Sequence, residues 1–95
     1  MVKKYIKKPV GIILEAVQWT GYNFDEIQEF VGRENVEFIR EIDPSKLCII
    51  TERPTPNRWV GFLVSLENYI VRNYHNKFNI YTKERFKQLF EVKHD

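Results

Sequence analysis

Cationic side chains are interleaved with aromatic ones in the C-terminal half of the chain, and these residue types could recognise an anionic ligand. The basic residues are Arg53, Arg58, Arg72, Lys77, Lys83, Arg85 and Lys87, and the aromatic ones are Trp59, Tyr69, Tyr74, Phe78 and Tyr81. Rings can stack on bases while cations contact phosphate, which suits a nucleotide or a single-stranded nucleic acid. The alternative is that the aromatic side chains form the core while the cations are solvated, which is the commoner arrangement.

The leading candidates for a binding site are Arg72, Lys77, Tyr81 and Arg85. Side chains alternate along a predicted hairpin over residues 69–81, so Arg72 shares with Ile70 the face opposite the core, and Lys77 in the turn can reach over that face. The N–H groups at the start of the helix that follows would favour an anion. We therefore expect a nucleotide-type ligand or an acidic protein patch to bind here.

Gln18 and Trp19 form a second candidate site, next to a turn at Thr20 and Gly21. The Trp could contribute contact area to a pocket, and the Gln amide could contribute a directed hydrogen bond. The alternative is a buried strand Trp whose N–H group is satisfied by the backbone. The sequence leaves both interpretations open.

Residue types needed for catalysis are sparse and scattered. His75, His94 and Cys48 do not have the spacing of metal ligands. Ser45 and Ser65 lie in turn-like segments without a nucleophile motif, and the four glycines form no phosphate-binding loop. We predict that the protein is not an enzyme and that it uses no cofactor or metal.

Length and composition predict one soluble globular domain over residues 1–95, with 43% hydrophobic and 29% charged residues. The single cysteine, Cys48, lies in the apolar run Leu-Cys-Ile-Ile, which predicts a buried and unreactive thiol in a reducing compartment. No apolar run approaches the roughly twenty residues of a transmembrane helix, and no leader pattern is present. We therefore expect a cytoplasmic protein with no membrane contact.

Charge is segregated along the chain. Residues 1–8 carry four lysines and no acid, residues 9–52 carry nine acidic and three basic residues, and residues 53–95 carry eight basic and four acidic residues. The slight net charge of +2 argues against a DNA mimic, and the lack of a basic recognition helix argues against duplex DNA as a partner. The sequence leaves both a monomer and a homodimer open.

Hydrophobic patterns predict an α+β fold. An apolar stripe with helical spacing begins after Asn23, an N-cap residue, and ends before Gly32, which predicts a helix over Phe24–Val31. A second helix, capped by Thr82, is predicted at about residues 83–88. Short β-branched and aromatic runs predict strands over residues 2–8, 10–19, 36–41, 46–51, 59–64, 69–72, 78–81 and 90–93.

These elements predict a small curved antiparallel sheet or a partly open barrel with one packed helix. The lysines on both sides of Tyr5 predict an exposed edge strand. The two prolines within residues 53–57 predict an irregular loop that joins two strands of a hairpin.

Both ends of the chain resemble one family of small bacteriophage and prophage proteins. KKPVGIILEAVQWTG is similar to the opening of that family, Lys-Lys-Pro, then Val or Ile, then Glu-Ala-Val-Gln-Trp-Thr-Gly. LENYIVRNYHNKFNIYTKERFKQLFE is similar to its ending, a Pro-Gly-Asp-Tyr-Ile-Ile strand, a glycine turn, a second strand and a short helix bearing Phe.

The C-terminal stretch departs from the family's pattern at several places. Leu66 and Glu67 stand where Pro-Gly is usual, Asn73 and Asn76 replace glycines, and Ile80 and Tyr81 replace Pro-Cys. Any role of the usual cysteine therefore does not carry over. The resemblance implies a phage origin and a small fold, and it implies no particular activity.

We therefore expect a phage or prophage accessory protein that acts in the bacterial cytoplasm by binding a host protein, such as a defence or replication component, and modulating it. This expectation rests on the resemblance and on analogy with other small phage domains. The alternative is a small-ligand binder, or sponge, that captures a nucleotide-type signal on the basic and aromatic face.

Overall fold

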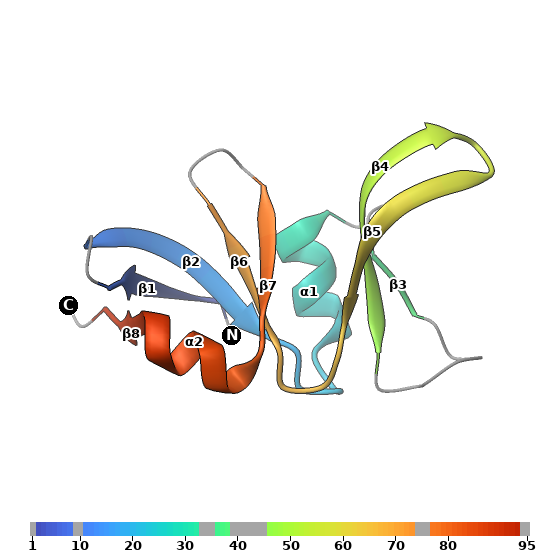
Figure 1. Cartoon of the computed structure of the whole chain (residues 1–95). Helices are drawn as coiled ribbons and strands as arrows, with labels where there is room; N and C mark the ends of the chain where they lie inside the picture. The colour runs from blue at the N-terminus through green and yellow to red at the C-terminus, as the bar shows by residue number, and fades with distance from the viewer. Residues whose placement is uncertain (1, 9–10, 33–35, 39–45, 74–76, 94–95) are drawn as a thin grey trace.

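The computed structural model describes all of the chain except residues 1, 9–10, 33–35, 39–45, 74–76 and 94–95 (Figure 1). The elements are, in order, β1 (Lys3–Lys7), β2 (Ile12–Gln18), α1 (Phe24–Val31), β3 (Val36–Phe38), β4 (Leu47–Thr55), β5 (Arg58–Val64), β6 (Tyr69–Arg72), β7 (Phe78–Tyr81), α2 (Lys83–Leu89) and β8 (Phe90–Val92). The predicted α+β class is confirmed. The described strands form two antiparallel sheets, in the orders β7-β6-β2-β1-β8 and β3-β4-β5, and close no barrel.

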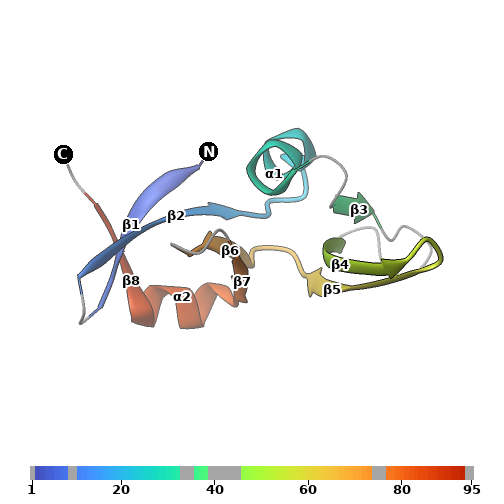
Figure 2. The same cartoon turned by 90° about the horizontal axis from the view of Figure 1, so that it is seen from above.

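The helices lie on opposite sides of the five-stranded sheet (Figure 2). Between α1 and one face, the core combines residues of β2 and β6 with residues of β4 and β5. Its buried members are Val17, Trp19, Ile27, Phe30, Val31, Leu47, Ile49, Val64 and Ile70. Between α2 and the other face, the buried members are Tyr5, Leu14, Ala16, Val71, Phe86 and Phe90. Strand alternation therefore sends apolar side chains into two separate layers of core.

Strand β1 corrects one prediction, because it lies inside the sheet and not at its edge. Tyr5–Lys7 is paired with β2 on one side and with β8 on the other. The pairing with β8 does not extend to Lys3 and Lys4, and these two residues are exposed. Long lysine side chains can lie along a sheet and still place their charge in water, so they mark an edge less reliably than we expected.

Helix α1 has the predicted bounds, with Ile27, Phe30 and Val31 buried. It ends at Gly32, whose φ of 110° is readily available only to glycine. Asn23 occupies the N-cap position, but its side chain makes no capping bond. Its Oδ1 instead accepts hydrogen bonds from the N–H and hydroxyl groups of Thr20, each at 2.9 Å, and so stabilises the turn that precedes the helix.

Helix α2 is one residue longer than predicted and is followed directly by β8. The predicted cap is confirmed, since Thr82 Oγ1 accepts a hydrogen bond from the N–H group of Arg85 at 3.2 Å. Phe86 is buried against the sheet. Neither helix in the described part of the chain is long and apolar enough to cross a membrane.

Strands β4 and β5 form a hairpin, here named the β4–β5 ribbon, whose far end projects beyond both helices (Figure 1). The pairing was predicted, but its length was not: β4 continues through Pro54 to Thr55, and only Pro56 and Asn57 form the turn. The register shifts between Ile50 and Thr55 explain this correction. A bulge leaves a backbone position without a ladder bond, and proline, which lacks an N–H group, is tolerated there.

Some predictions fall outside the described residues. They are the last part of the strand over residues 36–41, of which Val36–Phe38 is described, and most of the turn between β6 and β7. Cys48 is buried in β4, as predicted, and its low reactivity stays a prediction.

Candidate functional site

Arg72 lies on the α1 side of the sheet and connects β6 to that helix. Its Nη2 donates a hydrogen bond to the carbonyl oxygen of Phe30 at 2.5 Å, and its guanidinium carbon lies 4.4 Å from the centroid of the Phe30 ring. Its Nη1 is 3.6 Å from Oε1 of Glu15. The last carbonyl groups of a helix lack partners within the helix and carry partial negative charge, so a cation there is stabilising. The geometry therefore assigns Arg72 a structural contact at the end of α1.

Two of the other residues of the first predicted site are not on the same side of the sheet as Arg72. Tyr81 belongs to the α2 side, where its ring centroid is 5.3 Å from that of Phe90. Arg85 is exposed on α2 and donates a hydrogen bond to Oε1 of Gln88 at 3.1 Å. Lys77 is exposed and directly precedes β7. The four candidates therefore do not form one surface.

Two further predictions concern the side of the sheet on which Ile70 lies and the start of helix α2. Ile70 does share a side with Arg72, as alternation predicts, but α1 covers that side and Ile70 is fully buried. In the first turn of α2, the N–H group of Arg85 already donates a hydrogen bond to Oγ1 of Thr82. The binding of an anion at the start of α2 stays a prediction.

Most of the aromatic side chains on the α2 side stack on one another. The Tyr69 and Phe86 rings are parallel with centroids 3.8 Å apart, and the Phe86 and Phe90 centroids are 4.7 Å apart. Tyr5 meets Phe86 edge to face at 4.8 Å. Burial, with a smaller contribution from Tyr69, raises the pKa of the Tyr5 hydroxyl. For these rings the core interpretation is the one that the geometry supports.

Gln18 and Trp19 point to opposite sides of β2. Trp19 is fully buried in the α1 core, so its ring lines no surface pocket. Gln18 is half-buried, and its Nε2 donates a hydrogen bond to the carbonyl oxygen of Glu67 at 3.0 Å. The structure therefore places only the Gln of this pair at the surface.

Gln18 lines a small pocket, here named the Gln18 pocket, between the end of β2, the turn before β6 and α2. Its volume is about 310 Å3, and its lining residues are Gln18, Thr20, Leu66, Glu67, Tyr69, Lys83 and Lys87. Lys83 Nζ is 3.6 Å from Oε2 of Glu67, and no hydrogen bond or ion pair joins the Lys87 side chain to a described residue. The pocket thus brings two ammonium groups, one helical turn apart, beside an amide and a hydroxyl group.

Glu67 has an unusual backbone. Its φ of 71° makes it the one non-glycine residue in the described ranges with a positive φ. Residues 65–68 form a tight turn closed by a hydrogen bond from the N–H group of Asn68 to the carbonyl oxygen of Ser65 at 3.1 Å. A positive φ at the third position is characteristic of a type II turn, which favours glycine there and proline before it. Bonds to Gln18, Trp19 and Lys83 fix this strained residue.

An acidic groove of about 650 Å3 lies between α1 and the sheet. Its lining residues are Val2, Glu15, Asp25, Glu26, Glu29, Phe30 and Arg72. The sequence predicts the acidic face of α1 but not the groove, since Glu15 and Arg72 join it only through sheet pairing. Within the described ranges, no three His, Cys, Asp or Glu side chains are placed to hold one metal ion.

The β4–β5 ribbon carries exposed apolar side chains that the sequence analysis did not identify as a site. Val60, Phe62 and Leu63 are 51%, 44% and 53% exposed, although Val64, the next residue, is fully buried. β5 is an outer strand of its sheet, and among the described strands none is paired with its other side. Uncharged runs rich in β-branched and aromatic residues, such as residues 60–64, indicate a strand, but they do not distinguish an edge strand from an interior one.

The chain matches no family model, no curated protein and no solved structure.

Proposed function

We propose that the protein is a phage or prophage accessory protein that acts in the host cytoplasm by binding a host protein and modulating it. The observation that carries this proposal is the β4–β5 ribbon, which projects beyond the two helices and carries three half-exposed apolar side chains. Exposed apolar side chains that cluster on one segment cost solubility, so in a native protein such a cluster commonly marks an interaction site. Apolar and aromatic residues also form the buried centre of protein interfaces.

The phage origin in this proposal rests on the resemblance at both ends of the chain. The turn before β6 gives that resemblance added support. Glu67 stands where the family has glycine, and it adopts the positive φ that glycine favours. Leu66, the residue that stands where the family has proline, precedes it in the same turn. A divergent sequence that keeps an ancestral type II turn would have this combination.

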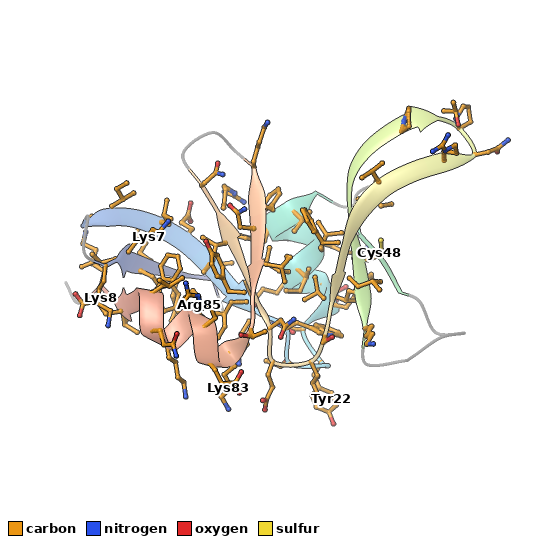
Figure 3. The ribbon with its side chains drawn as sticks, viewed as in Figure 1. Lys7, Lys8, Tyr22, Cys48, Lys83 and Arg85 are labelled. Carbon is orange, nitrogen blue, oxygen red and sulfur yellow. The ribbon has the colours of Figure 1, made fainter. Side chains whose placement is uncertain are left out.

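The test is capture of a host protein by the purified chain and by two matched variants. Leu63→Lys places a charge on the ribbon, whereas Tyr22→Lys makes the same kind of change at a 98% exposed residue in the loop between β2 and α1 (Figure 3). We expect a defined host protein to co-purify with the wild-type chain and with Tyr22→Lys, but not with Leu63→Lys. Equal capture by all three folded proteins would contradict a binding site on the ribbon.

The Gln18 pocket favours a second candidate function, the binding of a small anionic ligand of nucleotide type. Its volume is at the lower end of the range for ligand sites, and Lys83 and Lys87 supply the charge. Titration with a nucleoside monophosphate should shift the amide NMR signals of Gln18 and Glu67, and Lys87→Ala should weaken the effect while Lys77→Ala should not. Shifts that are equal for both variants would indicate nonspecific attraction to lysines and would exclude this pocket.

A further inference from the structure

We propose that β5 binds its partner by strand addition: an extended segment of the partner pairs with the outer edge of β5 and becomes a fourth strand of the β3-β4-β5 sheet. This inference rests on the proposed function and specifies how the ribbon would carry it out. In strand addition, main-chain hydrogen bonds supply affinity and alternate side chains supply specificity.

The edges of the two sheets differ in how well they are protected. In the five-stranded sheet the edge strands are β7, with four residues, and β8, with three; β3, with three, is the other edge of the smaller sheet. β5 has seven residues, and its last five, residues 60–64, contain no charge and no proline. Natural proteins usually protect edges with charge, proline or short length, because an open edge pairs with other chains. Of the described edges, β5 has the least of this protection.

β5 is also held in strand geometry before any partner arrives. Gly61 lies so close to β4 that a Cβ atom at this position would be 2.1 Å from the carbonyl oxygen of Ile49. Val64 and Ile49 belong to the buried core under α1, which fixes the base of the ribbon. A preformed strand avoids much of the entropic cost of ordering on binding.

The two sides of the strand offer different contacts to an added segment. By alternation, Phe62 lies on the same side as the buried Val64, whereas Leu63 lies on the opposite side. An extended segment with apolar residues at alternate positions can therefore contact a half-exposed side chain on each side of the sheet. We therefore assign to the partner an extended segment with apolar side chains at alternate positions.

We also assign to the partner segment an acidic residue at one end. Arg58, at the start of β5, is exposed, and no hydrogen bond or ion pair joins its side chain to a described residue. A carboxylate paired in register with Arg58 would gain a cross-strand ion pair. The residues from 60 to 64 are uncharged, so no like charges oppose the segment along the rest of the edge.

The interface area favours a different protein over a second copy of this chain. Complete burial of Val60, Phe62 and Leu63 would remove only roughly 300 Å2 from each chain, compared with about 800 Å2 per partner in a standard stable interface. Two copies joined at this short edge would present the same limited surface to each other. A partner segment that continues past the edge onto the body can supply the additional area.

The experiment uses a random peptide library selected on the immobilised full-length chain. We expect the enriched peptides to alternate apolar and polar residues, to lack proline within the run and to carry Asp or Glu at one end. Bound peptides should slow amide hydrogen exchange in residues 61–63 by at least about tenfold. Their affinity should fall at least about tenfold for Leu63→Lys and for Phe62→Lys, and should be unchanged for Tyr22→Lys.

Arg58→Ala tests the acidic position by itself. It should weaken the selected peptides roughly two- to fivefold, the range of an exposed ion pair, and neutral versions of the same peptides should be insensitive to it. Peptides with helical spacing of apolar residues, or peptides that protect other segments from exchange, would overturn strand addition. The exchange measurement needs no variant, so it remains decisive if a lysine substitution impairs folding.

The outcomes separate this inference from the proposed function. If a host protein is captured through Leu63 but the amide groups of β5 stay unprotected, the function stands and strand addition is wrong. If a host protein is captured and capture does not depend on Leu63, the ribbon is not the binding site and strand addition is wrong, whereas capture of no host protein would contradict the proposed function itself. A concentration-dependent dimer that Leu63→Lys abolishes would identify the occupant of the edge as a second copy and would overturn the inference.

Discussion

Replacing Glu67 by glycine should stabilise the protein, because the backbone at this position is strained for any residue with a Cβ atom. The left-handed region costs such a residue roughly 1–2 kcal/mol, and φ at Glu67 is 71°. Glycine also has more conformational freedom in the unfolded chain, and this offsets about 0.5–1 kcal/mol of the stabilisation. The ion pair with Lys83 at 3.6 Å, with side chains 38% and 58% exposed, contributes little.

Glu67→Ala is the matched control, since it removes the same ion pair but keeps the strain. We expect the glycine variant to be more stable than the alanine variant by ~0.5–1 kcal/mol, which corresponds to about 2–8 °C in Tm for a domain of this size. Urea unfolding followed by the fluorescence of the buried Trp19 measures the difference. If the glycine variant is no more stable than the alanine variant, the backbone at Glu67 is not strained. The turn then gives no support to the family resemblance.

Three other predictions concern the contacts that hold the layers together. Arg72→Met should destabilise by about 1.5–3 kcal/mol in chemical denaturation, because a charged hydrogen bond to the end of α1 is lost, whereas Lys77→Met at an exposed site should change little. Gly61→Ala should destabilise by more than about 2 kcal/mol, because its Cβ would meet the backbone of β4; a neutral effect would contradict the close approach. The pKa of Tyr5 is raised above its usual value near 10, so its contribution to stability is complete below that pH and is lost as the pH rises through the folded-state pKa. Tyr5→Phe should therefore flatten the alkaline fall in the free energy of unfolding, and an unchanged slope would contradict this.

The sequence predicts well those features that depend on neighbouring residues. The bounds of α1, the stop at Gly32 and the cap at Thr82 all depend on contacts within a few positions. The alternation of Ile70 and Val71 was also predictable. What alternation could not show is that α1 covers one of these sides and α2 the other, since that depends on the packing of distant elements.

The candidate site was harder to predict, because its side chains are committed to distant partners. Arg72 belongs to a basic and aromatic pattern, but its strongest contact is with the carbonyl group of Phe30, 42 residues away. Gln18 lines a pocket, which the sequence left as one of two interpretations, and its amide bonds to Glu67, 49 residues away. Trp19 follows the common behaviour of a large aromatic residue in a strand and fills the core.

The exposed edge of the ribbon could not be predicted, because it too depends on contacts between distant elements. Residues 59–64 were predicted as a strand, and strand patterns do not reveal whether a strand ends up at the edge or in the middle of a sheet. The extension of β4 through Pro54 requires a bulge whose position depends on the partner strand. The position of an uncharged apolar run at the edge of a sheet, with a described strand paired on one side alone, becomes visible only once the order of the strands is known.

Site-specific photo-crosslinking tests the central claim, that the partner binds at the ribbon, most directly. A photoreactive amino acid would replace Leu63 in one protein, Lys77 in a second and Arg85 in a third, so that the ribbon is compared with the basic residues of the C-terminal hairpin and helix. We expect a crosslink to the host protein from position 63 and none from positions 77 and 85. Crosslinks from 77 or 85 in the absence of one from 63 would contradict it.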